Sequence, residues 1–133
     1  MPTNPTVRPL FRPTSSVRLI ALTLWVAALA YLSLAPEVSA PGGVRIWDKF
    51  SHFTAYAVLA VLLIRVLALR RRLDVWWLLS AWLLCFSYGL LLEGLQGWMA
   101  LGRQFEGGDL FANALGALAG CALFCRNTVG SSR

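Results

Sequence analysis

Four apolar runs, each nearly long enough to cross a lipid bilayer as a helix, constrain this chain more than any other feature of its sequence. They are residues 19–35, 50–69, 75–92 and 110–124. At a rise of about 1.5 Å per residue, such runs approach the thickness of a membrane's hydrocarbon core, about 30 Å. A helix satisfies its own backbone hydrogen bonds in lipid, where no water can do so. The sequence therefore predicts an all-α fold, a four-helix transmembrane bundle.

The composition excludes a free soluble globule. Of the 133 residues, 58% are hydrophobic and only 14% are charged, and a domain this small has too much surface to hide so many apolar side chains from water. The charges lie in short clusters between the apolar runs, so the net charge of +6 does not indicate a nucleic-acid partner. Cys85, Cys121 and Cys125 fall inside apolar runs, where we expect structural thiols and no disulfide framework.

Basic residues mark the side of the membrane that each end of the bundle faces. One set precedes the first run, joins the second run to the third and follows the fourth: Arg8, Arg12, Arg18, Arg70, Arg71, Arg72, Arg126 and Arg133. The connections on the other side hold Arg45, Lys49 and Arg103. Because cytoplasmic loops carry the excess of Lys and Arg, we expect a multi-pass protein of the bacterial cytoplasmic (inner) membrane with both termini in the cytoplasm.

The predicted domain organisation is one membrane domain between two tails. Residues 1–16 contain four prolines among small polar residues and predict a flexible cytoplasmic tail. Residues 17–126 form the membrane domain, and residues 127–133 a short cytoplasmic tail. An alternative is that the first run is a secretory signal cleaved after Val38-Ser39-Ala40, which leaves three helices. Pro41 directly after that position is a poor context for cleavage, so we favour retention.

Polar side chains gather at the predicted outward end of the last three helices. Ionisable groups at or inside a membrane boundary are functional-site candidates, because leaving one in lipid costs roughly 2.5 kcal/mol or more. The residues of this cluster are Asp48, Lys49, His52, Tyr56, Glu93, Gln96, Arg103, Asp109 and Asn113.

Helical spacing places these residues on narrow stripes, one on each helix. The stripes are Asp48, His52 and Tyr56; Cys85, Gly89, Glu93 and Gln96; and Asp109, Asn113, Gly116 and Gly120. Two glycines four residues apart let helix backbones approach closely in membranes. We therefore expect the last three helices to pack through these stripes, with a polar pocket opening outward between their upper ends and the first helix at the periphery.

The same residues closely resemble the VanZ-like membrane protein family. The match rests on Asp48-Lys49-Phe50-Ser51-His52-Phe53, Tyr56, Glu93-x-x-Gln96, Gly102-Arg103 and Asp109-x-x-x-Asn113-x-x-Gly116-x-x-x-Gly120, and it spans roughly residues 44–124. The family is named for a protein associated with resistance to teicoplanin, a glycopeptide antibiotic that acts on outward-facing cell-wall precursors. The resemblance implies a link to glycopeptide resistance but brings no catalytic mechanism with it.

Binding of an envelope lipid or a lipid-linked cell-wall precursor is the function that we predict. Lys49 and Arg103 supply cationic donors for a phosphate head group. The other residues of the predicted ligand-binding set supply hydrogen bonds and charges. They are His52, Tyr56, Glu93, Gln96, Asp109 and Asn113. Membrane lipids are the expected partners, and the oligomeric state stays open.

Three other functions remain open at the sequence level. In a structural protein the polar cluster only fixes helix register. In an enzyme acting on a lipid-linked phosphate, His52 is the general acid or base, with Asp48 and Glu93 beside it, but no nucleophile motif supports this. Asp48, His52, Glu93 and Asp109 have the chemistry to hold Mg²⁺ or Mn²⁺, although we predict no metal and no cofactor.

A monomeric channel is disfavoured because no continuous row of polar residues crosses the predicted bundle.

Overall fold

The described part of the chain folds into four helices, each long and apolar enough to cross a membrane. The computed structural model describes residues 14–35, 45–69, 74–99 and 105–129, with the side chains of residues 45–47 and 126–129 left out. The helices are α1 (Ser15–Leu34), α2 (Arg45–Leu67), α3 (Val75–Met99) and α4 (Gly107–Val129). No strand occurs in these ranges. The all-α, four-helix prediction is confirmed.

Three helices extend beyond the apolar runs that predicted them. α3 continues past residue 92 to Met99, α2 begins at Arg45 and α4 begins at Gly107. The additional turns carry polar residues, among them Glu93, Gln96 and Asp109, that face other helices and are buried. A hydropathy pattern identifies only the apolar part of a helix. The helix itself can extend further, where polar side chains on its buried face contact neighbouring helices.

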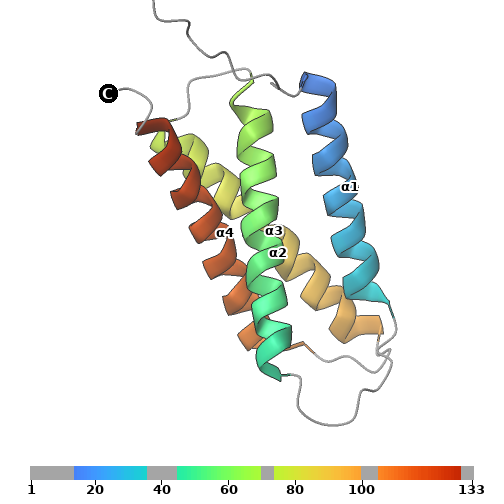
Figure 1. The fold of residues 1–133 in the computed structure, drawn as a ribbon. Coiled ribbons are helices and arrows are strands. Elements are labelled where there is room, and N and C mark those ends of the chain that lie inside the picture. Colours follow the sequence, from blue (N-terminus) through green and yellow to red (C-terminus); the bar gives the residue numbers. More distant parts are fainter. Residues whose placement is uncertain (1–13, 36–44, 70–73, 100–104, 130–133) are drawn as a thin grey trace, which may run out of the picture.

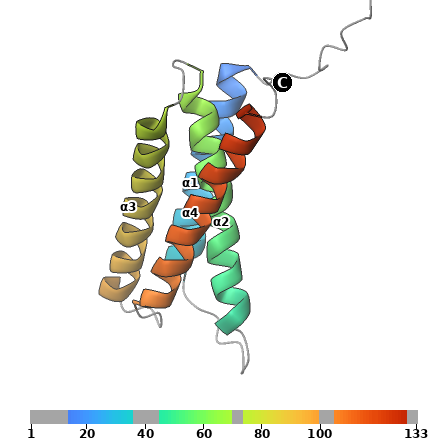
Figure 2. The same cartoon turned by 90° about the vertical axis from the view of Figure 1, so that its left-hand side faces the viewer.

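Three of the helices form the centre of the bundle, and the fourth lies outside it. α2 packs most extensively against α4, and α3 contacts both. α1 contacts α2 and α3 but not α4 within the described residues, and it lies on the side of α2 that faces away from α4 (Figure 1). Figure 2 shows α3 running along one side of the others. Leu29 is the one buried residue of α1, as expected for a peripheral helix.

The contact between α2 and α4 is close because two glycines remove side chains from it. A Cβ atom on Gly116 would overlap the carbonyl group of Phe53, and one on Gly120 would overlap that of Ala57. Both carbonyl groups belong to the backbone of α2, which cannot move aside without displacing the helix. The pair of glycines therefore fixes the separation and register of α2 and α4.

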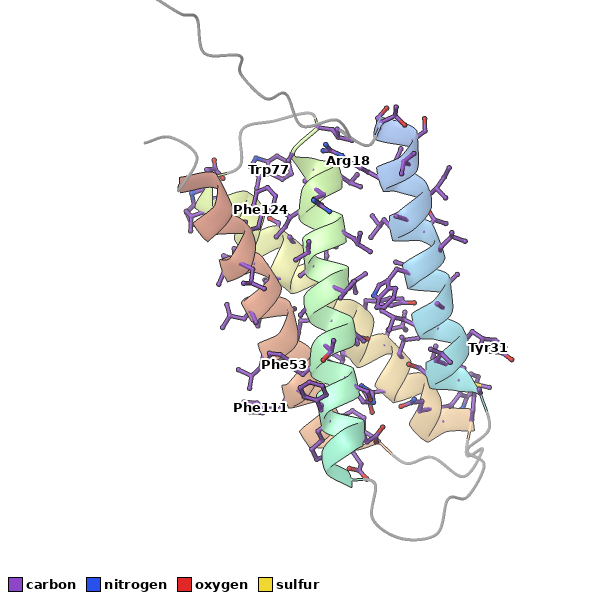
Figure 3. The ribbon with its side chains drawn as sticks, viewed as in Figure 1. Arg18, Tyr31, Phe53, Trp77, Phe111 and Phe124 are labelled. Carbon is purple, nitrogen blue, oxygen red and sulfur yellow. The ribbon has the colours of Figure 1, made fainter. Side chains whose placement is uncertain are left out.

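The outer surface of the bundle is apolar, as a surface that faces lipid must be. Tyr31 on α1 and Phe111 on α4 point away from the bundle on opposite sides (Figure 3), with exposed fractions of 75% and 65%. Large exposed Leu residues continue this surface along α3 and α4. Because a soluble monomer rarely exposes so extensive an apolar surface, the arrangement supports the membrane location.

Candidate functional site

The buried polar side chains of the described chain collect at one end of the bundle. This end is formed by the N-terminal turns of α2 and α4 and the C-terminal turns of α1 and α3, at the bottom of Figure 1. The buried polar residues are Glu93, Gln96, Asp109 and Asn113, exposed by 6% or less. We call this region the polar end. The structure thus brings together the described members of the predicted site.

Lys49 reaches from α2 across to α4. Its Nζ lies 2.9 Å from Oδ1 of Asp109 and 3.3 Å from Oε2 of Glu106. Gly108 makes room for this reach, since a Cβ there would lie only 2.8 Å from Nζ. The two carboxylates sit at the start of α4, where the helix dipole favours negative charge. Lys49 is therefore paired with two carboxylates at the start of α4, and its role as a phosphate donor stays a prediction.

His52 connects α2 to the other two central helices. Its Nδ1 lies 3.0 Å from Oδ1 of Asn113, and because an amide oxygen can only accept, this hydrogen bond forms in the tautomer with the proton on Nδ1. Oε1 of Glu93 lies 4.0 Å from the same nitrogen, and Oδ1 of Asp48 lies 3.9 Å from Nε2. An imidazole between two carboxylates is an arrangement that acid–base chemistry can use.

Side chains of α2 and α4 pack closely against α3 around Gly89. Tyr56 and Asn113 are almost completely buried, and both press against Gly89 of α3. A Cβ on Gly89 would lie 3.1 Å from Nδ2 of Asn113 and 3.1 Å from Cε1 of Tyr56. Around Gly89 the stripes of the three helices therefore interlock, and the pocket expected between their upper ends stays a prediction.

A pocket of about 150 Å³ lies between α1 and α2. From α1 it is lined by Leu29, Leu32 and Ser33. From α2 it is lined by Asp48, Ser51, His52, Ala55 and Tyr56. Sequence analysis named four polar positions of α2 but gave α1 no part in the site.

Gln96 holds α1 at the polar end. Its Nε2 donates to the carbonyl oxygen of Ser33 at 2.6 Å, and Ser33 lies in the last turn of α1, where backbone carbonyls have no partner within the helix. Gln96 was predicted to contact a ligand. Its amide nitrogen has an intramolecular partner in Ser33, a residue that also lines the α1–α2 pocket.

Two tryptophans and a tyrosine deeper in the bundle were missed by the sequence analysis. Trp25 donates to the carbonyl oxygen of Ala55 at 3.0 Å, Tyr88 to that of Val26 at 2.7 Å, and Trp82 to that of Ala114 at 3.0 Å. The N–H of a tryptophan or the O–H of a tyrosine inside a membrane needs a hydrogen-bond acceptor. The presence of these residues in apolar runs was therefore a sequence signal for contacts between helices. The bond of Trp25 attaches α1 to α2, and the bond of Tyr88 attaches α3 to α1.

Three ligand-forming side chains come close enough to suggest a cation site. One atom each of Asp48, His52 and Asp109 lies within 4.8 Å of the other two. Carboxylates with one imidazole suit Mg²⁺ or Mn²⁺ better than Zn²⁺. However, the ammonium group of Lys49 already contacts Asp109, and its positive charge opposes a second cation there.

Some predicted residues have no described surroundings, and one important residue was not predicted. Arg103 lies outside the described residues, and Arg45 begins α2 with its side chain outside them. Glu106 was not singled out, although an acidic residue three positions before Asp109 at a helix start is a recognisable signal. Ser51 donates its hydroxyl to the backbone oxygen of Asp48 at 2.6 Å, which engages it away from His52.

Comparison with known proteins places the chain in one family. A family model described as VanZ/LLP1 matches residues 3–128, nearly the whole chain. Neither the curated proteins nor the solved structures include a significant match.

Proposed function

Because the chain belongs to the VanZ/LLP1 family, we propose that it is a membrane protein whose polar end binds an envelope lipid or a lipid-linked cell-wall precursor. The observation that carries this proposal is the pocket between α1 and α2. Ligand pockets with an apolar wall and a few convergent polar groups are the usual form of a binding site.

The pocket changes from polar to apolar with depth. α2 runs inward from the polar end and α1 runs outward to it, so Asp48 and Ser33 lie outermost while Ala55 and Leu29 lie deeper. Trp25, one turn deeper on α1 than Leu29, donates a hydrogen bond to the backbone of Ala55. Leu32 is 64% exposed on the outside of the bundle, so the pocket adjoins the surface that faces lipid. An amphiphile with its head at the membrane boundary matches this gradient.

The distribution of basic residues supports an outward-facing polar end in the bacterial cytoplasmic membrane, with both chain termini in the cytoplasm. We expect a fluorescent protein fused after Arg133 to fluoresce and alkaline phosphatase fused there to be inactive. The opposite pattern would place the polar end in the cytoplasm and exclude an outward-facing precursor as the ligand.

A contribution to glycopeptide resistance follows if the ligand is a cell-wall precursor. Cells that carry the gene should then tolerate more teicoplanin than cells without it, while their tolerance of an antibiotic with an intracellular target stays unchanged. Equal teicoplanin susceptibility in both strains would remove resistance from the proposal and leave lipid binding to be tested by itself.

Lipid retention by the purified protein tests the binding proposal. We expect native mass spectrometry of the gently extracted full chain to show one retained envelope lipid. Leu32→Trp, which fills the pocket, should lose it. Leu83→Trp is the matched control because Leu83 is similarly exposed, on α3 and away from the pocket. Equal retention by both variants would contradict binding in this pocket.

A purely structural role is the second candidate, and a specific observation favours it. Lys49 is paired with Asp109 and Glu106, His52 with Asn113, and Gln96 with α1. Such contacts fix helix register without any ligand. If the wild-type chain retains no lipid while substitutions at these pairs lower its stability, the structural role is the correct one.

A further inference from the structure

The α1–α2 pocket presents two acceptors at its polar mouth. Asp48 Oδ1 and His52 Nε2 are 3.9 Å apart, which is too far for a hydrogen bond between them. In the neutral imidazole, the donation from Nδ1 to Asn113 leaves a lone pair on Nε2. A carboxylate oxygen and an imine-type nitrogen thus lie side by side, and no described side chain donates a hydrogen bond to either.

We infer that this pocket binds the primary ammonium group of a membrane amphiphile, with the ammonium donating to Asp48 and His52 together. This inference rests on the proposed function and specifies the ligand's chemistry. An ammonium nitrogen has three donors that spread at tetrahedral angles. Placed about 2.9 Å from each of two acceptors 3.9 Å apart, it satisfies both with ordinary hydrogen-bond lengths.

The charge at the mouth favours a cation over a phosphate. Asp48 is the one carboxylate in the pocket lining, and no hydrogen bond to that carboxylate occurs among the described residues. Lys49, the next residue, pairs with Asp109 and Glu106, and among the described residues it forms no ion pair with Asp48. An anionic head group would meet like charge at Asp48 and the lone pair at Nε2, which disfavours it.

The pocket suits an organic ammonium better than a metal ion. A divalent ion bound by Asp48, His52 and Asp109 would lie close to the ammonium of Lys49, which contacts Asp109 at 2.9 Å. An ammonium at the mouth donates to Asp48 and His52 without using Asp109, and its single charge meets less repulsion from Lys49 than a divalent ion would. The apolar lower part, with Leu29 and Ala55, also accepts methylene groups, for which a hydrated ion has no use.

Lipid retention with matched acyl chains tests this inference. The purified full chain is offered phosphatidylethanolamine and phosphatidylglycerol, and bound lipid is counted by native mass spectrometry. We expect about tenfold stronger retention of phosphatidylethanolamine, the size of effect that one charge-assisted hydrogen bond provides. Asp48→Asn should reduce the preference to near equality without reducing the binding of phosphatidylglycerol.

A second variant covers the case in which Asp48→Asn does not fold. Ser51→Lys places a tethered ammonium in the lining, one helical turn from Asp48, and should abolish the preference in the same way. Gly94→Lys on α3 is its matched control and should keep the preference, because Gly94 is also exposed at the polar end, is not part of the lining and has open space around a Cβ.

Two further arms identify the source of the cation. Millimolar ethanolamine, which lacks an acyl chain, should not displace the lipid, and EDTA should leave the preference unchanged. Displacement by ethanolamine would show a site for a soluble amine, and loss with EDTA would show a metal-bridged phosphate. Either result overturns the inference. Equal retention of both lipids, lost together in Leu32→Trp, overturns the ammonium specificity but leaves the proposed function standing, whereas no retained lipid removes both.

Discussion

α2 forms two contrasting interfaces, one with α4 and one with α1. Toward α4 it packs against glycines, and its polar side chains pair directly with side chains of the neighbouring helix. Toward α1 it packs loosely enough to leave a pocket, and the hydrogen bond across that interface at Trp25 ends on a backbone carbonyl. We call these the tight and the open interface.

The contrast explains how adjacent residues of one helix can have different roles. Asp48 and Lys49 are consecutive, but successive residues of a helix point about 100° apart. Lys49 therefore faces the tight interface and pairs with Asp109, whereas Asp48 lines the open one. A dense polar cluster need not be one site. Here Lys49 sets the register of α2 and α4, Asp48 is available to a ligand, and His52 takes part in both interfaces.

The largest expected effect comes from crowding the tight interface. Gly116→Val puts side-chain atoms where the backbone of Phe53 lies, and we expect it to lower the free energy of unfolding by about 3 kcal/mol. Unfolding in SDS-containing mixed micelles measures this. Gly94→Ala is the control, because nothing lies within 4 Å of a Cβ there, and it should not destabilise the protein. Equal effects of the two substitutions would mean that α2 and α4 are not closely packed.

A smaller loss is expected from removing a polar contact at the same interface. Asn113→Leu deprives His52 of its acceptor and should cost about 1 to 2 kcal/mol, because the buried imidazole N–H is left without that partner. A double-mutant cycle with His52→Leu isolates the contact. If the two substitutions are strictly additive, His52 and Asn113 do not interact in the membrane.

Removing one hydrogen bond from the open interface should lower the free energy of unfolding by less than either substitution at the tight interface. Trp25→Phe keeps the apolar ring and removes the N–H donor to Ala55. We expect a cost of about 0.6 kcal/mol, typical of single hydrogen bonds within membranes, and faster hydrogen exchange confined to α1. A global loss as large as that of Gly116→Val would show that α1 belongs to the centre of the bundle.

The helices and their buried faces could be predicted from sequence because they depend on local periodicity. Apolar length indicated four spans, and spacing placed Cys85, Gly89, Glu93 and Gln96 on one face of α3, where all four are buried. The glycines of α4 were expected to permit close packing, and α2 is the helix that takes the position beside them.

The location of the pocket could not be predicted, because helical phase shows which residues share a face but not which helix that face meets. The acceptors that attach α1 are the carbonyl oxygens of Val26 and Ser33. Every residue has such an oxygen, so nothing in the sequence of α1 marks them. The end of α3 and the start of α4 were misplaced for a related reason. A hydropathy scale gives buried polar residues the same low values as loop residues.

One crossed comparison at Asp48 and Lys49 tests the division of the polar end most directly. Stability and the ratio of retained phosphatidylethanolamine to phosphatidylglycerol are measured for Asp48→Asn and Lys49→Met. We expect Asp48→Asn to change stability by less than about 0.5 kcal/mol and to abolish the lipid preference, while Lys49→Met lowers the melting temperature and keeps the preference. If each substitution changes stability and preference together, the two interfaces of α2 are not functionally distinct and the account is wrong.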